Sequence, residues 1–258
     1  MKTPNPTLEG KSIIVTGAAQ GIGRAIADLA LSMGATVTVV DLNRDALAAF
    51  QAEVGPDRLL TQCGDVADPA FAQAVVDAAA SKFGALHGLV NNAGITRTAM
   101  IEKMTLEQWR LVIDVHLSGS FYFLQAIGRH MLARIRAGDT APGSIVNISS
   151  DAGRAGTVGQ INYGAAKAGI FGLTMCAARE WGKYNVRVNT VGFGVVETPM
   201  TETIRSEKFA DTYMARIPLA RWSKAEEVAQ PICYLLSDAA SYITGQHISA
   251  NGGMTIGL

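Results

Sequence analysis

The hydrophobic pattern of the chain alternates between short apolar runs, rich in Val and Ile, and longer stretches with helical periodicity. This alternation is typical of a parallel sheet with crossover helices on both faces, so the predicted fold class is α/β. The pattern predicts strands at residues 12–16, 35–40, 58–63, 87–91, 144–149, 186–191 and 246–250. It predicts helices at residues 22–33, 43–53, 69–82, 105–136, 161–182, 200–214 and 224–236.

Two irregular segments stand out against this pattern. The stretch "HLSGS", residues 116–120, places a glycine and two serines inside the long helix predicted at 105–136 and indicates a break there. Residues 192–223 form the longest irregular connection, which is a candidate substrate loop because long connections in compact α/β domains are often binding loops. We expect residues 1–10 to be a flexible N-terminal segment and residues 11–258 to form a single domain.

Composition and charge restrict the classes of partner. The 258 residues are 48% hydrophobic and 17% charged, which is a globular composition. Lys and Arg together equal Asp and Glu at 22 each, and no basic block occurs, so we expect a small-molecule substrate, with no nucleic-acid or membrane partner. No signal-peptide core and no run of 18 apolar residues occurs, which predicts a cytoplasmic protein.

Cysteines and histidines show no metal-binding pattern. The three cysteines, Cys63, Cys176 and Cys233, are widely spaced in apolar surroundings and are expected to be small buried core residues. The four histidines lack metal-ligand spacing, so no metal site is predicted.

Tyr163 and Lys167 stand four residues apart in "NYGAAKAG", a stretch made mostly of glycine and alanine. On a helix this spacing places both side chains on one face. An ammonium group about 5.5 Å from a phenol, at an effective dielectric of about 20, favours the phenolate by about 3 kcal/mol, or roughly two pKa units. The pair therefore predicts proton transfer near neutral pH, although a surface tyrosine and a surface lysine one turn apart have the same spacing.

A glycine-rich turn, "TGAAQGIG", connects the first predicted strand to a helix. Its spacing, G-x-x-x-G-x-G, lets backbone amides and the positive helix end meet a pyrophosphate, but a glycine turn can also be a simple connection. Asp41 ends the second predicted strand, where a carboxylate can accept hydrogen bonds from adenine ribose hydroxyls. Asp41 could instead cap the next helix, a role that Asn43 could equally provide. Together the turn and the acid predict a dinucleotide site.

Polar residues also follow the third and fourth predicted strands. "CGDV" places Asp65 and Val66 after the third strand, and "LVNNAG" places Asn91 and Asn92 after the fourth. Ligands of such sheets bind outside the carboxyl ends of the strands, so we expect these residues to contact the cofactor. Asp and Asn are also ordinary turn formers, which is the alternative explanation.

These motifs, in this order, resemble the short-chain dehydrogenase/reductase family across essentially the whole chain. The resemblance is carried by "TGAAQGIG", "NNAG", "NISS", "YGAAK", "VRVN" and the C-terminal "SYITGQHISANGGM". It implies a single-domain Rossmann-like doubly wound parallel sheet, a bound nicotinamide cofactor, and hydride transfer to or from a carbonyl group.

The resemblance also implies roles for individual residues. Tyr163 would be the general acid/base, and Lys167 would bind the nicotinamide ribose and lower the tyrosine pKa. Ser150, thirteen residues before Tyr163, would donate a hydrogen bond to the substrate oxygen. Val196 and Thr198 would contact the nicotinamide carboxamide. The full set of expected cofactor contacts is Gly17, Gln20, Gly21, Ile22, Gly23, Asp41, Leu42, Asp65, Val66, Asn91, Asn92, Gly94, Tyr163, Lys167, Val196 and Thr198.

The chain departs from the family pattern at His116, where the family usually has Asn, and at Phe193, where it usually has Pro. The family's Asn holds a water that joins the lysine to bulk solvent. An imidazole can also hold a water, so we include His116 among the expected catalytic residues, with a pKa lowered by the nearby Lys167. The alternative is a histidine that caps or fills the broken helix. Phe193 leaves φ free and restores an N–H beside the nicotinamide.

Within the family, the chain looks most similar to the 3-oxoacyl reductases, judging from "NNAGITR" and "IPLARWSKAEEVA". The expected reaction interconverts a secondary alcohol and a ketone, such as a 3-hydroxyacyl and a 3-oxoacyl compound. The acyl-carrier reductases commonly have arginines where this chain has Ala141 and Tyr184, with Arg134, Arg136 and Lys183 nearby. A coenzyme A thioester, or another small alcohol or ketone such as a sugar, steroid or diketone, therefore stays open.

The expected cofactor is NAD(H), with NADP(H) as the alternative. A 2′-phosphate beside Asp41 would bring like charges together, and Gln20 adds no positive charge, whereas Arg44 could swing toward a phosphate. Family members are often tetramers built on the long helices. Because "SFYFLQAIGRHML" and "GIFGLTMCAAREW" carry more apolar residues than one buried face needs, we expect a homotetramer.

Two other functions are compatible with parts of the pattern. A nucleotide-sensing protein could keep the fold without the chemistry, although the presence of Ser150, Tyr163 and Lys167 together argues against it. A hydrolase could use Ser150, but no G-x-S-x-G elbow surrounds that serine.

Overall fold

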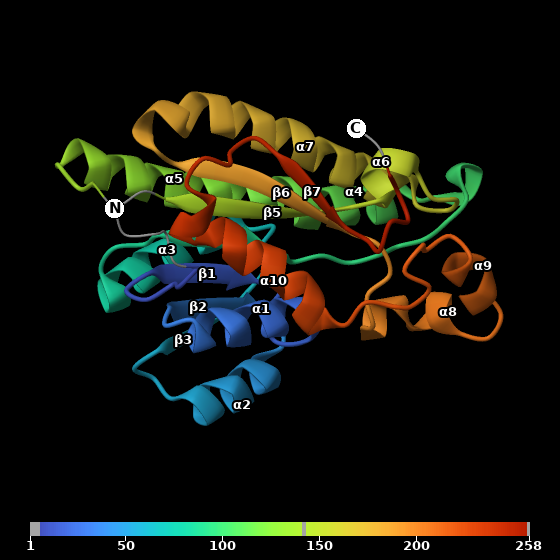
Figure 1. Ribbon diagram of the computed structural model, residues 1–258, viewed down its shortest axis with the longest axis horizontal. Coiled ribbons are helices and arrows are strands. Elements are labelled where there is room, and N and C mark those ends of the chain that lie inside the picture. The colour runs from blue at the N-terminus through green and yellow to red at the C-terminus, as the bar shows by residue number, and fades with distance from the viewer. Residues whose placement is uncertain (1–5, 141–142, 257–258) are drawn as a thin grey trace.

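The computed structural model describes residues 6–140 and 143–256. In this part of the chain, seven parallel strands form one sheet in the order β3-β2-β1-β4-β5-β6-β7 (Figure 1). The strand order reverses beside β1, where Ile13 pairs with Val37 of β2 on one side and with Gly88 of β4 on the other. The predicted doubly wound parallel sheet is confirmed, and its switch point lies where such folds bind ligands.

The strands are β1 (Ser12–Thr16), β2 (Thr36–Asp41), β3 (Leu59–Cys63), β4 (Gly88–Asn91), β5 (Ser144–Ser150), β6 (Arg187–Phe193) and β7 (His247–Ala250). The longer helices are α1 (Gly21–Ser32), α2 (Arg44–Val54), α3 (Pro69–Phe83), α4 (Leu106–Ile113), α5 (Gly119–Arg136), α7 (Ile161–Trp181) and α10 (Ala225–Leu236). The short helices are α6 (Ala152–Ala155), α8 (Glu202–Arg205) and α9 (Ala210–Met214). Single turns lie at η1 (Ile101–Lys103), η2 (Asp114–Ser118), η3 (Gly182–Tyr184), η4 (Pro199–Thr201) and η5 (Asp238–Ala240).

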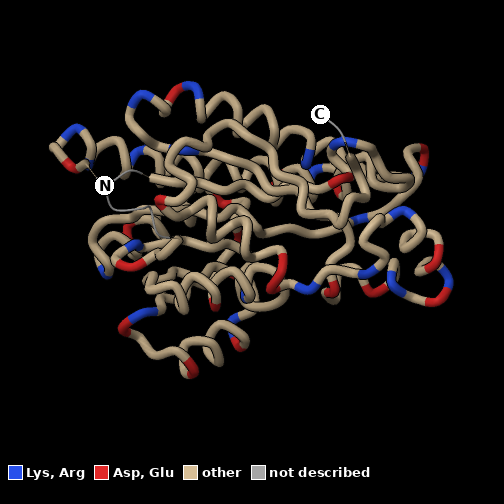
Figure 2. The backbone as a smooth tube through the Cα atoms, viewed as in Figure 1, with Lys and Arg blue, Asp and Glu red and all other residues tan. Residues whose placement is uncertain are grey.

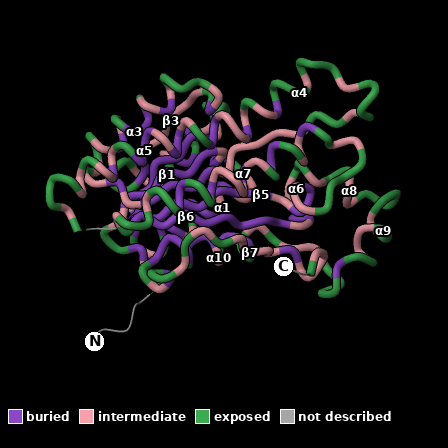
Figure 3. Tube along the Cα trace, turned by 90° about the horizontal axis from the view of Figure 1, so that it is seen from above, coloured by how far each residue is buried: buried purple, intermediate pink, exposed green. Residues whose placement is uncertain are grey.

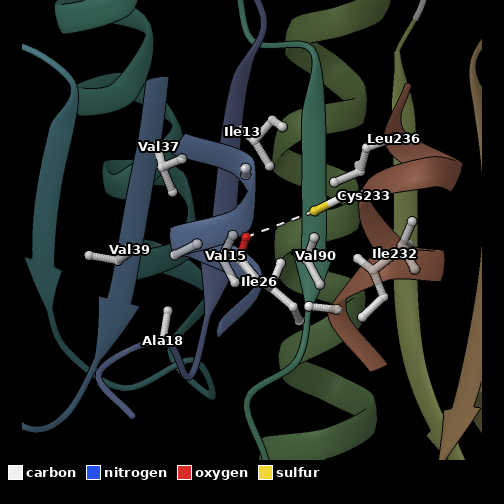
Figure 4. Packing of buried hydrophobic residues seen from close by; sticks show 14 of the residues in the cluster. Ile13, Val15, Ala18, Ile26, Val37, Val39, Val90, Ile232, Cys233 and Leu236 are labelled. Carbon is white, nitrogen blue, oxygen red and sulfur yellow. Dashed lines mark hydrogen bonds between the residues drawn. The ribbon is translucent and has the colours of Figure 1, made fainter. Parts of the chain in front are cut away.

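Helices cover both faces of the sheet, and each face has its own apolar core. Helices α1, α2 and α10 pack on one face, where Val15, Ile26 and Ile232 meet (Figure 4). Helices α3, α5 and α7 pack on the other face, and Ile14 points into that second core. Because neighbouring strand residues point to opposite faces, both positions of each inner strand must be apolar, which explains the uninterrupted Val and Ile runs. The inner strands are accordingly buried along most of their length (Figure 3).

The predicted break in the helix at 105–136 is not an interruption. Helix α4 continues through the π-helical turn η2 into α5, so the backbone path stays helical from one to the other. Among the described residues, this 31-residue segment, Leu106–Arg136, is long and apolar enough to cross a membrane by length and composition. Half of its most apolar window is buried inside the structure, as in the core helix of a globular fold.

The prediction of one continuous helix at 200–214 is wrong. The segment contains the turn η4 and the short helices α8 and α9, which are separated at Ser206, where the backbone is extended at ψ 155°. The proposed substrate loop, 192–223, therefore carries short helices of its own, and its first two residues belong to β6. Helix α6, with four residues, is too short to leave a periodic signal in the sequence.

The segment expected to be flexible, residues 1–10, is described only from residue 6, and within that part Leu8 packs on the fold. Leu8 is fully buried, and its N–H donates to the carbonyl of Met33 at 2.9 Å. Residues 1–5 of that segment lie outside the described residues. The expectation for the cysteines holds for Cys233, whose burial raises the thiol pKa to about 12, whereas Cys63 is half-buried and Cys176 is exposed on α7.

Charged residues of both signs are interspersed over the outer turns and helices, and the sheet carries few of them (Figure 2). The two short helices α8 and α9 lie at one end of the molecule together with α6 (Figure 1). Helix α6 follows β5 and the α8–α9 segment follows β6, so this is the end at which the parallel strands finish.

Candidate active site

A cavity of about 330 Å³ opens at the carboxyl ends of β1, β2 and β4. Most of the expected cofactor contacts line it, namely Gly17, Gln20, Gly21, Ile22, Gly23, Asp41, Leu42, Asp65, Val66, Asn92, Gly94 and Thr198. The sequence interpretation missed other lining residues, namely Gly64, Ala93, Ile95, Val115, Pro199 and Met200. Gly64, Ala93 and Ile95 follow β3 and β4, so their place after a strand could have indicated them, whereas Val115 lies in η2 and Pro199 and Met200 lie in η4.

The glycine turn needs its glycines for steric reasons. Gly17 and Gly21 have φ of 65° and 56°, in the region that side chains disfavour. A Cβ on Gly23 would lie 2.0 Å from the carbonyl oxygen of Gly17, which is closer than atoms can approach. The N-cap residue of α1, Gln20, makes no side-chain hydrogen bond to the helix end. The first N–H groups of α1 are therefore available to an anion in the cavity.

Asp41 is held in place by the backbone. Its Oδ2 accepts a hydrogen bond from Ala19 N and its Oδ1 accepts one from Asn43 N, each at 3.0 Å. Asn43 supplies the N-cap of α2 through its own side chain, which accepts from Ala46 N at 3.0 Å. The alternative role of Asp41 as a helix cap is therefore filled by its neighbour, and the carboxylate faces the cavity.

The two neighbouring asparagines at the end of β4 have different positions: Asn91 is the last residue of the strand and Asn92 follows it. Asn92 Nδ2 donates to the carbonyl oxygens of Thr16 and Gly17 at 3.0 Å each, which ties the glycine turn to β4. Asn91 is only 4% exposed, and its Nδ2 donates to Ser120 O at 3.1 Å and to Asn147 Oδ1 at 2.8 Å. Asn91 does not line the cavity, because strand alternation turns its side chain into the core.

A second group of expected residues gathers where α7 crosses β5. Lys167 Nζ donates to Ile148 O at 2.7 Å, and Ser149 Oγ donates to Lys167 O at 2.8 Å. Tyr163 lies one turn earlier on the same helix face, with the Lys167 ammonium 5.6 Å from its ring centre. The Ser150 side chain lies close enough to the Tyr163 phenol to favour its charged form. Ser150, rather than the buried Ser149, thus faces the tyrosine.

The electrostatics of this pair differ from the sequence estimate. Burial raises the pKa of Tyr163, and the neighbouring Ser150 hydroxyl only opposes that rise. Burial also lowers the pKa of Lys167 to about 7. The expectation that the lysine lowers the tyrosine pKa is wrong in this state of the protein, because removal from water penalises both charged forms.

His116 lies in the π-helical turn and is 2% exposed. Its Nε2 lies 2.9 Å from Ile95 N and 2.7 Å from Ile95 O, so one ring nitrogen serves the loop that follows β4. Its Nδ1 is buried without a hydrogen-bond partner in the described part of the chain. The ring meets Tyr163 edge-on, with ring centres 5.1 Å apart. Burial first, and the Lys167 charge second, lower the pKa of His116 to about 3, in the expected direction.

The residues after β6 are placed by backbone pairing. Val196 is buried and forms an isolated parallel bridge with Ser223, while Thr198 lines the cavity. Phe193 ends β6 and pairs in register with Ser150 of β5 and Ala250 of β7. The residue that replaces the family's usual Pro is therefore an ordinary, 6% exposed strand residue.

Comparisons with known proteins agree with this geometry. A family model described as enoyl-(acyl carrier protein) reductase matches residues 17–255. The 3-oxoacyl-(acyl-carrier-protein) reductase of Thermotoga maritima is 43% identical over 251 residues, covering 96% of this chain and 99% of the relative. The chain belongs to the short-chain dehydrogenase/reductase family. A D-threitol dehydrogenase of Mycolicibacterium smegmatis is 38% identical, covering 96% and 94% of the two chains.

A solved short-chain dehydrogenase/reductase, a glucose/ribitol dehydrogenase from Brucella melitensis, superposes with a TM-score of 0.88 at 34% identity. It covers 96% of this chain and 98% of its own. Members of this family are oxidoreductases that use nicotinamide cofactors. The residues present fit such a cofactor. The glycine turn leaves no room for a side chain at Gly23, and the Asp41 carboxylate is held at the end of β2 by the backbone. Within the described residues, no group of three or more His, Cys, Asp and Glu side chains is arranged to hold a metal ion.

Proposed function

We propose that this short-chain dehydrogenase/reductase is an NAD(H)-preferring enzyme that interconverts a 3-oxoacyl and a 3-hydroxyacyl compound. The observation that carries the proposal is the Ser150–Tyr163 hydroxyl pair, which lies beside buried Lys167 on the rim that also holds the dinucleotide cavity. The acyl substrate is supported by the 43% identical 3-oxoacyl reductase. A polyol is the second candidate, favoured by the 38% identical D-threitol dehydrogenase.

The chain's own residues supply binding and proton transfer, and the nicotinamide supplies or accepts the hydride when it is bound. Ser150 Oγ donates a hydrogen bond to the carbonyl oxygen of the substrate and holds it against Tyr163. Tyr163 Oη donates its proton to that oxygen in the reductive direction and takes it back in the oxidative direction. Lys167 and the neutral His116 both lie next to the Tyr163 ring, and they would return a proton to Tyr163.

Arg134, one of the cationic residues considered from the sequence for the acyl carrier, is bound within the fold. Arg134 donates through Nε and Nη2 to Asp139 Oδ2 at 3.0 and 2.7 Å, and Nη1 donates to Leu86 O. Its guanidinium is engaged at the opposite end of the sheet from the cavity, and Ala141 lies outside the described residues. We therefore propose a thioester substrate without assigning its carrier, and a cytoplasmic location for the reaction.

Replacing Tyr163 by Phe removes the transferable proton without changing the shape of the ring. We expect Tyr163→Phe to lower kcat by about 10²- to 10⁴-fold, because general acid catalysis contributes that much, while the Kd of NADH stays within about threefold. NADH oxidation with a panel of 3-oxoacyl thioesters and ketones measures kcat, and NADH fluorescence measures the Kd of NADH. Tyr242→Phe, at a fully exposed tyrosine, is the matched control. A Tyr163→Phe enzyme with more than a tenth of the wild-type kcat contradicts the assignment.

The position of Asp41 predicts the cofactor preference. A 2′-phosphate there meets a carboxylate, and two like charges about 4 Å apart cost roughly 1–4 kcal/mol, so we expect kcat/KM to favour NADH by at least tenfold. Asp41→Ala should narrow the gap, whereas Asp45→Ala, at an exposed acid in the first turn of α2, should leave it unchanged. Equal values with the two cofactors, or a higher one with NADPH, would overturn the preference.

We propose that His116 bridges Lys167 to solvent as a neutral imidazole, through its buried Nδ1. His116→Asn keeps a polar group there and should retain substantial activity. His116→Leu should lower kcat at least tenfold, with the NADH Kd changed less than threefold. The loss of kcat should be the same across pH 6 to 9, because the imidazole pKa of His116 is about 3 and the ring stays neutral in that range. A leucine variant that turns over normally makes His116 structural. A large loss of NADH affinity instead assigns it to support of Ile95.

We also propose a homotetramer that uses the outer faces of α4, α5 and α7. Apolar side chains stand exposed there at Leu111, Phe121 and Met175, at 42%, 44% and 51%. Light scattering should give four times the 27.2 kDa chain mass, and Phe121→Arg should lower that mass. A monomer mass for the wild-type protein at micromolar concentration would rule the tetramer out.

A further inference from the structure

Asp151, the residue after Ser150, is a buried acid with a dedicated partner. It is 8% exposed, and both of its carboxylate oxygens accept from Asn251 Nδ2 at 2.9 Å. Burial raises its pKa, and the hydrogen bond from Asn251 and the charges of Arg154 and Arg216 oppose that rise. A buried carboxylate costs free energy unless it is hydrogen-bonded, so the contact with Asn251 is one the fold depends on at this place.

Asn251 organises the chain that follows β7. Its Nδ2 also donates to Thr255 O at 3.3 Å, and its Oδ1 accepts from Gly253 N at 3.0 Å, so one amide fixes the tail 251–255. Asn251 is 7% exposed and packs on Gly194, where a Cβ would lie 3.1 Å from the Asn251 Cβ. The tail is thereby placed against the first residue after β6.

The same tail reaches the end of the proposed substrate loop. Leu219 N donates to Gly252 O at 3.1 Å. Gly252 and Gly253 leave room for Ile217 and Pro218, since a Cβ on either glycine would lie 2.8 Å from those side chains. The tail therefore connects two parts of the site, the turn after Ser150 and the base of the substrate loop.

The main chain of Asp151 also holds the turn that carries Ser150. Asp151 N donates to Phe193 O at 3.2 Å, and Asp151 O accepts from Arg154 N at 3.0 Å and from Ala155 N at 2.8 Å. Ser150 Oγ itself accepts from Ala152 N at 3.3 Å, inside the same turn. The direction of the Ser150 hydroxyl thus depends on a turn that the Asp151 carboxylate fastens to the tail.

We propose that Asp151 is a positioning residue for Ser150, and that its hydrogen-bonded pair with Asn251 fastens the Ser150 turn to the C-terminal tail and so to the base of the substrate loop. The proposal rests on the proposed role of Ser150 as the donor to the substrate oxygen. Loss of the pair lets the Ser150 hydroxyl move relative to Tyr163. A misplacement of that kind lowers kcat much more than it weakens cofactor binding. The expected cofactor contacts in the glycine turn follow β1, and Asp41 ends β2, so neither belongs to the Ser150 turn.

The test compares Asp151→Ala, Asn251→Ala and the exchanged pair, Asp151→Asn with Asn251→Asp. Each single variant should lower kcat at least tenfold, with the NADH Kd within about threefold. The exchanged pair again sets an amide against a carboxylate and should recover at least a third of the wild-type kcat. Asn189→Ala is the control, because Asn189 is an equally buried amide that donates to Ile243 O at 2.8 Å, away from Ser150. It should lower the melting temperature without the loss of kcat.

Two further measurements separate this proposal from the proposed function. In a Ser150→Ala background, Asp151→Ala should have no additional effect on kcat, because the residue it positions is gone. In protein with isotope-labelled tyrosine, the Tyr163 Cζ chemical shift should move in the same direction in Asp151→Ala as in Ser150→Ala, and should stay in place in Asn189→Ala. This second readout needs no turnover, so it holds even if no carbonyl substrate is found and the proposed function fails.

The proposal is overturned if Asp151→Ala folds and keeps the wild-type kcat and Tyr163 shift. It is also overturned if Asn189→Ala lowers kcat as much, or if the exchanged pair is as impaired as the single variants. Should Asp151→Ala not fold, Asn251→Ala and the exchanged pair give the same comparisons. In that case an Asn251→Ala enzyme with normal kcat and an unmoved Tyr163 shift rejects the positioning role.

Discussion

Two hydrogen bonds that hold α7 against β5 determine the geometry of the candidate site. Lys167 Nζ donates to Ile148 O at 2.7 Å, and Ser149 Oγ donates to Lys167 O at 2.8 Å. The close approach of this part of α7 to α6 also requires Gly153, since a Cβ there would lie 2.7 Å from the carbonyl carbon of Lys167. Once the helix is held in this way, Ser150 at the end of β5 and Tyr163 one turn before Lys167 must face each other.

The same contact creates the electrostatic state of the site. Tyr163, Lys167 and His116 are all removed from water, and burial favours the neutral form of each. The phenol therefore keeps its proton at neutral pH, which is the form that the proposed proton donation by Tyr163 requires. Lys167, with a pKa lowered to about 7, is poised to change charge near neutrality, so it can exchange protons where an exposed lysine would stay charged.

Features with a local signal were predictable from the sequence, and features set by tertiary contact were not. The seven strands and the glycine turn follow from apolar runs and from backbone positions that only glycine tolerates. The sequence could not separate Asn91 from Asn92, because only the strand's alternation decides which amide faces the cavity. It also placed a break at "HLSGS", where a π-helical turn keeps the helix continuous. The pKa of Tyr163 was misjudged because burial depends on residues distant in the sequence.

A buried polar row explains why α7 occupies one position along the sheet. Asn91, Asn147 and Thr190 are in register across β4, β5 and β6, and none is more than 4% exposed. Asn147 Nδ2 and Thr190 Oγ1 both donate to Thr174 Oγ1 of α7, at 2.9 and 2.8 Å, while Asn91 Nδ2 donates to Asn147 Oδ1 at 2.8 Å. On a purely apolar surface a helix could slide with little loss, but these groups are all satisfied in a single register. The row therefore fixes the distance of Tyr163 from the strand ends, and it occupies the Asn91 amide in doing so.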